Sequence, residues 1–299
     1  MKSIRILQGD CIESLKKLED QSINTCITSP PYWGLRNYNE EVKRVLRDDG
    51  TVWLNLGDTY SSHKDCKSTP QSLAKGMKSE VAHVIEKGKS VSRNTKKLKA
   101  AGLKNKDLIG IPWRVALALQ QDGWYLRQDI IWHKPNPMPE SVKDRCTKAH
   151  EYIFLLSKSP KYYFDNEAIK EDGVIKAGTK GAKGSKDRQN QKGVNARPPE
   201  YKIYDGKRNK RSVWTVTTKP FKGAHFATFP MDLIEPCVLA GCPEGGTVLD
   251  PFAGSGTTGI VAVNHNRHAV MCELNKEYIE LAKKRIREDA GMYAKVYED

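Results

Sequence analysis

The sequence lacks the cysteine pattern of a disulfide framework or a structural zinc site. Seven cysteines occur among 299 residues, an odd number, and none belongs to a C-x-x-C pair. Their spacing relative to the histidines matches no common ligand pattern, so we predict no metal site. Free cysteines also suit a reducing compartment, which favours the cytoplasm.

Long apolar runs are missing as well. No stretch approaches the roughly 20 apolar residues that a membrane-spanning helix needs, and Met1–Arg5 contains no apolar signal core. Hydrophobic residues make up 38% of the chain and charged residues 29%. This composition predicts a soluble globular protein without a membrane partner, long enough for one large domain with insertions.

Acidic residues are scarce relative to basic ones. The chain has 36 acidic residues against 50 Lys and Arg, which gives a net charge of +14. Such a bias favours a polyanionic partner, most simply nucleic acid, although a merely soluble basic protein is the alternative. The excess is strongest in two segments, with twelve basic and three acidic residues in 62–106 and twelve and five in 171–211. Both are too polar for a core, so we expect them to be insertions, the second either a linker or a segment ordered by nucleic acid.

Elsewhere, apolar segments with strand and helix periodicity alternate. We predict strands at 4–7, 23–27, 51–57, 124–131, 152–156, 247–250 and 269–273, and helices at 12–18, 40–46, 112–121, 230–239 and 277–287. The segment 251–258 is expected to turn into a further helix that ends at 264. Residues 47–50 are expected to close the second helix as a turn, and 162–165 are a candidate for a further strand. The alternation predicts an α/β fold with a mostly parallel sheet and helical crossovers.

A proline corner follows the second predicted strand. The segment Thr28–Trp33 reads Thr-Ser-Pro-Pro-Tyr-Trp and comes directly after the apolar run Ile23–Ile27. The prolines end the strand and leave a hydroxyl, two rigid carbonyls and two aromatic rings where it emerges. On its own, this segment equally fits a proline-rich turn whose aromatic rings lie in the core.

A glycine-rich turn follows the strand 247–250. Strand, glycine-rich turn, helix, strand and acid is the order of a nucleoside-binding unit, in which Glu273 at the end of the second strand can bind ribose hydroxyls. Gly254, Gly256 and Gly259 formally match the dinucleotide pattern G-x-G-x-x-G. That match is weak, because Asp250-Pro251-Phe252 stands where a dinucleotide site has glycine directly after the strand.

The segment Asp250–Thr258, Asp-Pro-Phe-Ala-Gly-Ser-Gly-Thr-Thr, resembles the S-adenosylmethionine loop of amino-group DNA methyltransferases. The segment Thr28–Tyr32 resembles their catalytic motif, and its position before the cofactor loop is typical of the beta class. The resemblance implies a doubly wound, seven-stranded, mostly parallel sheet with the last strand antiparallel. It also implies a division of the chain into a catalytic half (1–60), a basic insertion (61–106), a continuation (107–170), a target-recognition insertion (171–211) and a cofactor-binding half (212–299).

The same resemblance assigns a cofactor site. Glu273 would bind the ribose, and Asp10 and Cys11 would lie near the adenine ring. The segment with His225, Phe226 and Phe229 would close over the methionine. The residues that would line the methionine and ribose part of the site are Asp250, Phe252, Gly254, Ser255, Gly256 and Thr257. Alternatives stay open for three of these residues. Phe226 and Phe229 equally suit the core, and Asp10 could be a helix N-cap.

The catalytic residues implied are Ser29, Pro30, Pro31 and Tyr32. An exocyclic amino group is a poor nucleophile because its lone pair is delocalised into the ring. Acceptors at Ser29 Oγ and the Pro30 carbonyl would bind its N–H protons and free the lone pair, while Tyr32 would stack on a base flipped out of the duplex. A 5-methylating enzyme instead needs a cysteine nucleophile, and Cys237 lies in an apolar helical pattern that predicts a structural role.

The target base and partners follow from the resemblance. Serine at the first motif position favours N4 of cytosine, with N6 of adenine as the alternative. An RNA amino-methyltransferase and an inactive nucleic-acid-binding protein are further alternatives.

Double-stranded DNA is the expected partner, with a cognate restriction endonuclease in a restriction–modification setting, and the enzyme would be a monomer or a homodimer. The predicted DNA contacts are Arg36, Arg188, Asn190, Gln191, Asn195 and Arg197. The loop after Tyr38 is shorter than in relatives, so either it is genuinely short or a segment is missing from the chain.

Overall fold

The computed structural model describes residues 2–30, 39–61, 102–175, 177–179, 205–218, 229–290 and 294–298. Several predicted site residues lie outside these ranges and stay predictions: Pro31, Tyr32, Arg36, Arg188, Asn190, Gln191, Asn195, Arg197, His225 and Phe226.

The described chain forms a nine-stranded sheet in the order β11-β1-β10-β9-β2-β3-β5-β4-β8. The strands are β1 (Lys2–Gln8), β2 (Ile23–Thr28), β3 (Leu46–Leu56), β4 (Tyr125–His133), β5 (His150–Ser157), β8 (Val213–Thr215), β9 (Thr247–Asp250), β10 (His268–Glu273) and β11 (Ala294–Glu298). Only β5 runs antiparallel to its neighbours, β3 and β4. The fold class is therefore confirmed, whereas the implied count of seven strands is wrong because β11 and β8 extend the two edges.

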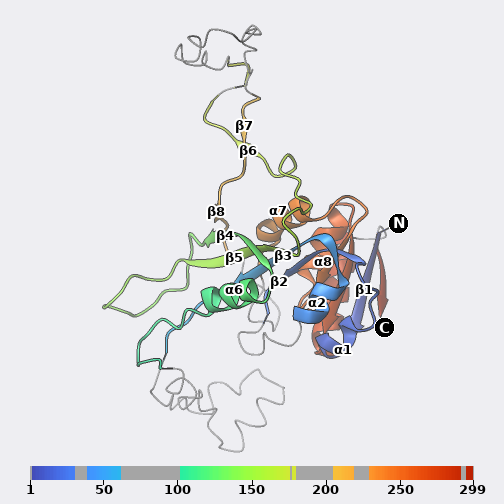
Figure 1. Cartoon of the computed structure of the whole chain (residues 1–299), viewed down its shortest axis with the longest axis horizontal. Coiled ribbons are helices and arrows are strands. Elements are labelled where there is room, and N and C mark those ends of the chain that lie inside the picture. The colour runs from blue at the N-terminus through green and yellow to red at the C-terminus, as the bar shows by residue number, and fades with distance from the viewer. Residues whose placement is uncertain are drawn as a thin grey trace, which may run out of the picture.

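Helices cover both faces of the sheet, as a doubly wound fold requires (Figure 1). One layer contains α7 (Met231–Gly241), α8 (Thr257–Asn264) and α9 (Lys276–Ala290), whose apolar side chains form one buried cluster with the sheet. The other contains α1 (Cys11–Leu15), α2 (Asn39–Val45) and α6 (Ile111–Gln121), which form a second cluster. Alternate residues of β2 and β3 join opposite clusters, since Ile27 and Trp53 belong to the first and Cys26 and Leu54 to the second. None of the helices in the described ranges is long and apolar enough to cross a membrane.

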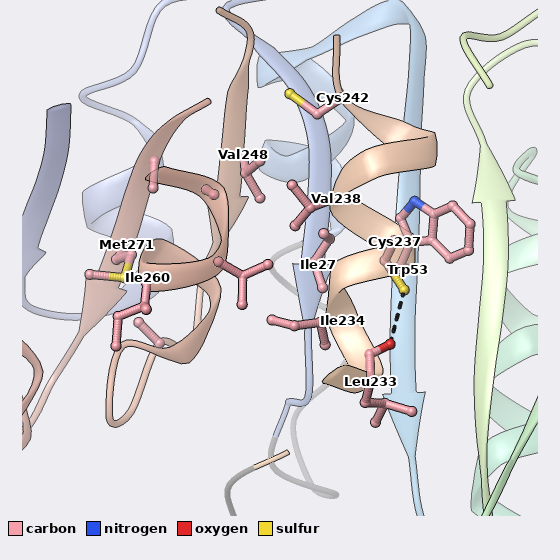
Figure 2. Close-up of a cluster of buried hydrophobic side chains, with 14 of the residues drawn as sticks. Ile27, Trp53, Leu233, Ile234, Cys237, Val238, Cys242, Val248, Ile260 and Met271 are labelled. Atoms are coloured by element: carbon pink, nitrogen blue, oxygen red, sulfur yellow. Dashed lines mark hydrogen bonds between the residues drawn. The ribbon is translucent and has the colours of Figure 1, made fainter. Parts of the chain in front are cut away.

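The first cluster is shown in Figure 2. Ile234 and Val238 of α7 lie on the side of the helix that faces Ile27 of β2, and Trp53 of β3 lies on the other side. Burying each aliphatic side chain of this kind contributes about 1.5–3 kcal/mol. Gly241 ends α7 close against the sheet, since a Cβ there would lie 2.6 Å from Trp53 Nε1. The helix is thus fixed over the strand that carries the proline corner.

Three local predictions need correction. The segment 47–50 belongs to β3, where pairing with β2 passes from Leu46 directly to Thr51, so the expected turn is an irregularity within the strand. The segment 162–165 is no strand, since the amide of Tyr163 bonds to Asp49 in the irregular part of β3 and the amide of Asp165 bonds to Ala240 of α7. No strand is predicted after the helix 277–287, yet the segment 294–298 pairs with the edge of β1.

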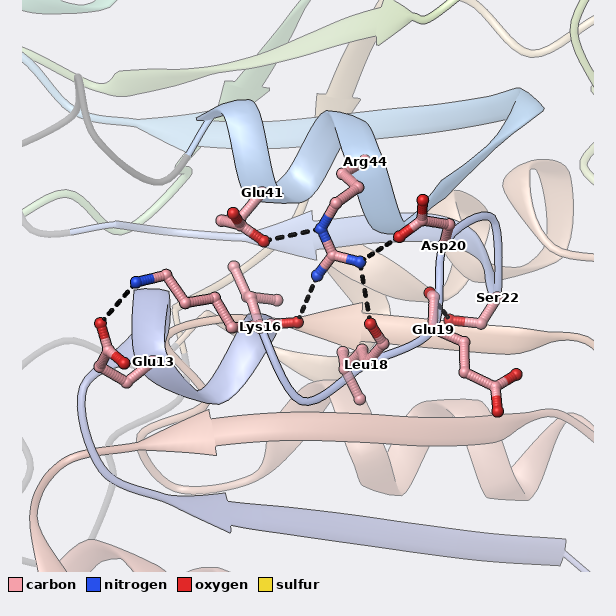
Figure 3. A network of polar contacts seen from close by, with 9 residues as sticks. Glu13, Lys16, Leu18, Glu19, Asp20, Ser22, Glu41 and Arg44 are labelled. Atoms are coloured by element: carbon pink, nitrogen blue, oxygen red, sulfur yellow. Dashed lines mark hydrogen bonds and ion pairs between the residues drawn. The ribbon is translucent and has the colours of Figure 1, made fainter.

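Arg44 fixes α2, the helix that follows the proline corner, to the end of α1 and to the segment after it (Figure 3). Its guanidinium donates to the carbonyls of Leu15 and Leu18 at 2.8 and 2.9 Å, and it also pairs with Asp20 and Glu41. Five donors in one plane allow a single arginine to satisfy all of these acceptors. One end of the loop that begins at the proline corner is therefore anchored.

A short two-stranded stem closes the base of the second basic insertion. β6 (Glu171–Asp172) pairs antiparallel with β7 (Lys207–Arg208), and in Figure 1 this stem stands away from the main sheet. Glu171 binds both Arg208 and Arg211, while Lys207 pairs with Asp172. The two ends of the insertion therefore leave the fold side by side.

Candidate active site

The predicted site residues gather at one edge of the sheet. Strands β1, β10, β9, β2 and β3 are parallel neighbours, so their carboxyl ends meet there. These ends carry the predicted residues Asp10, Glu273, Asp250 and Ser29, and also Asn55, which was not predicted. Ligands of open α/β sheets bind outside this edge. The fold thus brings the proline corner and the glycine-rich loop, which lie far apart in sequence, to adjacent strands.

The glycine-rich loop has a backbone that only glycine adopts without strain. Gly254 has φ 51° and Gly256 has φ 78°, and Gly256 is also the N-cap of α8. A Cβ on Gly256 would lie 2.9 Å from Cβ of Ala282, so this glycine also lets α9 approach. Gly259 has a packing role instead, since a Cβ there would meet Met271 Sδ at 2.7 Å. The formal G-x-G-x-x-G match therefore reflects two different requirements.

The side chain of Asp250 connects the proline corner to the glycine-rich loop. Its carboxylate accepts hydrogen bonds from Thr28 Oγ1 at 2.8 Å, Thr258 Oγ1 at 2.6 Å and the amide of Phe252 at 3.1 Å. The residue is only 1% exposed. Burial raises the pKa of Asp250 to about 6, although the hydrogen bonds from Thr258 and Thr28 act in the opposite direction. Its side chain therefore joins the two loops internally, and a ligand contact at this position would fall to its backbone.

Two further predicted cofactor residues lie at the ends of β10 and β1. Glu273 Oε2 accepts from the amide of Gly254 and Oε1 from that of Asn275, both at 2.8 Å. Asp10 is the N-cap of α1, where its Oδ1 accepts from the amide of Ile12 at 2.9 Å. The capping interpretation of Asp10 is therefore confirmed. Each Glu273 oxygen has a second lone pair that can accept from a ribose hydroxyl.

The remaining described candidates differ in exposure. Ser29 is exposed at the end of β2 and Pro30 is buried beside it. Cys11 is partly buried, and burial together with the neighbouring Asp10 raises the pKa of its thiol. Phe229 packs against the first core cluster, in agreement with the core alternative. Ser29 is thus the catalytic candidate within the described ranges that presents its side chain to solvent.

Sequence reasoning missed Arg285, a residue of α9 that binds the glycine-rich loop through hydrogen bonds. This residue of α9 donates to the carbonyl of Ser255 at 2.6 Å and to its hydroxyl at 2.7 Å. It also lies 3.2 Å from Thr257 Oγ1. Burial lowers the pKa of the guanidinium, but an arginine stays charged at neutral pH. In the sequence, Arg285 is one of several basic residues in the run 283–287, so nothing local distinguishes it from its exposed neighbours.

Comparison with known proteins identifies the family. The model of the DNA methylase (N6/N4 methyltransferase) family matches residues 23–284, which include both motifs. The chain belongs to the DNA methylase family. The resemblance inferred from the two motifs is thereby confirmed.

Two similar proteins are type II methyltransferases. M.Cfr9I of Citrobacter freundii is 43% identical over 94% of this chain and 87% of its own length. M.SmaI of Serratia marcescens is 43% identical over 96% of this chain and 91% of its own length.

Solved structures show the same fold at low sequence identity. A DNA modification methylase from Thermus thermophilus in complex with S-adenosyl-L-methionine has a TM-score of 0.59 at 22% identity, with 98% of both chains covered. The cytosine-N4-specific PvuII DNA methyltransferase has a TM-score of 0.63 at 16% identity, covering 99% of this chain and 95% of its own.

Proposed function

We propose that this DNA methylase is the site-specific methyltransferase of a type II restriction–modification system and methylates N4 of cytosine. The names of its 43% identical relatives support the type II assignment. The single observation that carries the proposal is the exposed Ser29 beside the glycine-rich loop, linked to it through Thr28 and Asp250. Serine at this position favours cytosine, and N6 of adenine is the second candidate.

The residues at the edge fit S-adenosylmethionine as methyl donor. Glycines at 254 and 256 allow the backbone to approach the ligand closely, and Glu273 supplies acceptors for ribose hydroxyls. When bound, S-adenosylmethionine supplies an electrophilic methyl group on sulfur. The loop that would bind S-adenosylmethionine is held by Arg285 of α9, which bonds to Ser255, and by Asp250, which bonds to Thr258.

Ser29 Oγ and the Pro30 carbonyl would orient the target amino group. Both can accept its N–H protons, which favours a pyramidal nitrogen with its lone pair directed at the methyl carbon. With such a donor bound, the N–C bond would form as the S–C bond breaks, and one N–H proton would then leave for water. Orientation of this kind supplies much of the rate in a displacement without a covalent enzyme intermediate.

Methylation of mixed-sequence duplex DNA followed by nucleoside mass spectrometry tests the proposal. We expect N4-methylcytosine as the product. N6-methyladenine alone would replace cytosine by adenine as the target. Methyl transfer to structured RNA but not to DNA would favour the RNA alternative, and cofactor binding without transfer to either would favour an inactive binding protein.

The role of Ser29 has its own test. Ser29→Ala should lower kcat far more than it weakens S-adenosylmethionine binding, because in this proposal its hydroxyl would contact the base and not the cofactor. Undiminished turnover would remove Ser29 from the mechanism.

A further inference from the structure

Asn55 lies next to Ser29 at the same edge of the sheet. Strands β2 and β3 are parallel, with Ile27 opposite Trp53 and Thr28 opposite Leu54. One residue further along, Ser29 therefore leaves β2 beside Asn55 of β3. Neighbouring strands lie roughly 5 Å apart, and residues in register point to the same face. A base amino group held at Ser29 would thus lie within reach of Asn55.

The amide of Asn55 is held in one orientation. Its Nδ2 donates to the carbonyl of Tyr152 at 3.1 Å and to Glu151 Oε2 at 3.3 Å. A carbonyl and a carboxylate accept hydrogen bonds and cannot donate them, so the nitrogen must be the atom that faces them. The carbonyl oxygen, Oδ1, consequently points away from both.

Glu151 is itself held in place. It pairs with Lys134, whose ammonium lies 4.0 Å from the ring centroid of Trp132. Lys134 and Glu151 are 18% and 23% exposed, and Asn55 is 6% exposed. A partly buried ion pair of this kind fixes the carboxylate that receives the amide. Within the described ranges, the hydrogen bonds of the Asn55 amide all involve Nδ2, and none involves Oδ1.

We propose that Asn55 Oδ1 accepts a hydrogen bond from the exocyclic amino group of the target base and that Glu151, supported by Lys134, is the positioning residue that presents this oxygen. The pair Ser29 and Asn55 would then supply acceptors from two adjacent strands. Since a neutral amide takes up no proton, Asn55 orients the amino group and the released proton still passes to water. The inference rests on the proposed transfer to an amino group but not on the choice between cytosine and adenine.

Binding to bases with and without the amino group tests the proposal. The target site is first mapped on methylated duplex DNA with the wild-type enzyme. The dissociation constant is then measured for a duplex with the natural target base and for one with its amino-lacking analogue, pyrimidin-2-one for cytosine or purine for adenine. Removing the amino group also weakens base pairing, so the wild-type ratio of the two constants is the reference.

We expect Asn55→Ala to shift this ratio roughly fivefold against the natural base, the scale of one neutral hydrogen bond. S-adenosylmethionine affinity should stay unchanged and kcat should fall. Glu151→Gln keeps an acceptor but loses the ion pair with Lys134, and should shift the ratio in the same direction by a smaller factor. Asn264→Ala, at the exposed end of α8 where Asn264 bonds to Asp289, is the matched control and should leave the ratio unchanged.

An unchanged ratio in Asn55→Ala, with both dissociation constants weakened equally, would overturn the proposal and leave Asn55 with a structural role. If Asn55→Ala does not fold, an unchanged ratio in Glu151→Gln would do the same. Failure of the proposed function is a different result, namely wild-type enzyme that methylates neither base.

Discussion

The hydroxyl of Thr28 lies 2.8 Å from Oδ1 of Asp250 and joins the residue before the catalytic serine to the first residue of the cofactor loop. The bond lies out of solvent, since both residues are at most 2% exposed. Asp250 Oδ2 accepts from Thr258 at the start of α8. One buried carboxylate therefore sets the positions of both loops, and a change on either side is transmitted to the other.

Thr28→Val should damage both stability and turnover. It removes a donor from a buried carboxylate, which costs about 1–3 kcal/mol of unfolding free energy, and it frees the backbone at Ser29. Thr25→Val is the matched control, because Thr25 lies in the same strand but donates to the carbonyl of Thr51. Denaturant unfolding and kcat are measured for both variants. A fall in kcat no larger for Thr28→Val than for Thr25→Val would argue against coupling of the loops.

Asp250 should make stability depend on pH in a predictable direction. Its pKa is raised to about 6 in the folded protein, mainly by burial, and is about 3.9 in an unfolded chain. The folded state therefore binds this proton more tightly. The contribution of Asp250 to stability is complete below about pH 4 and is lost as the pH rises through 6. Relative to Asp250→Asn, the wild type should become more stable between pH 7 and pH 4, and a flat difference in unfolding free energy would contradict this assignment.

Arg285→Met should weaken cofactor binding selectively. The variant loses the hydrogen bonds to the carbonyl and hydroxyl of Ser255, so the loop is no longer held in its binding conformation. We expect the dissociation constant for S-adenosylmethionine to rise about tenfold, which corresponds to roughly 1.4 kcal/mol. Arg287→Met, an exposed position on the same helix, is the control. Equal affinities of the two variants in a titration would show that Arg285 does not position the loop.

Cys237→Ala should retain methyl transfer. Cys237 is fully buried in α7, and burial raises the pKa of its thiol well above the ordinary range, so no thiolate is available at neutral pH. Its Sγ contacts the carbonyl of Leu233 (Figure 2). We expect a stability loss of about 1 kcal/mol with kcat close to that of the wild type. Abolished transfer by a variant that still folds and binds S-adenosylmethionine would reopen covalent catalysis.

The elements that position the site follow local patterns and could be predicted. The apolar run before Thr28, the strand 247–250 and the glycine-rich turn each appear where the sequence places them. Their meeting at one edge follows from the parallel arrangement of the strands. The requirement for glycine at 254 and 256 could also be predicted, because glycine is needed where the backbone has a positive φ or where another group approaches the backbone closely.

Features that depend on distant pairs were not predictable. Thr28 and Asp250 are separated by 222 residues, and no local pattern indicates that one donates to the other. The strand β11 was missed because its pairing depends on the free edge of β1, and the irregularity at 47–50 resembles an ordinary turn in sequence. The domain boundaries and the roles of most site residues stay predictions.

The stem formed by β6 and β7 allows the second basic insertion to change in evolution independently of the sheet. Gly173 donates its amide to the carbonyl of Gly206 at 2.7 Å, so the segment between them begins and ends at one point. The length and composition of the segment between Gly173 and Gly206 can therefore change without altering the register of the sheet. A deletion that joins Gly173 to Gly206 should keep the unfolding midpoint and S-adenosylmethionine binding while losing discrimination between DNA sequences. A collapse of the midpoint would mean instead that the insertion is part of the fold, and that new sequence specificities must evolve together with the sheet.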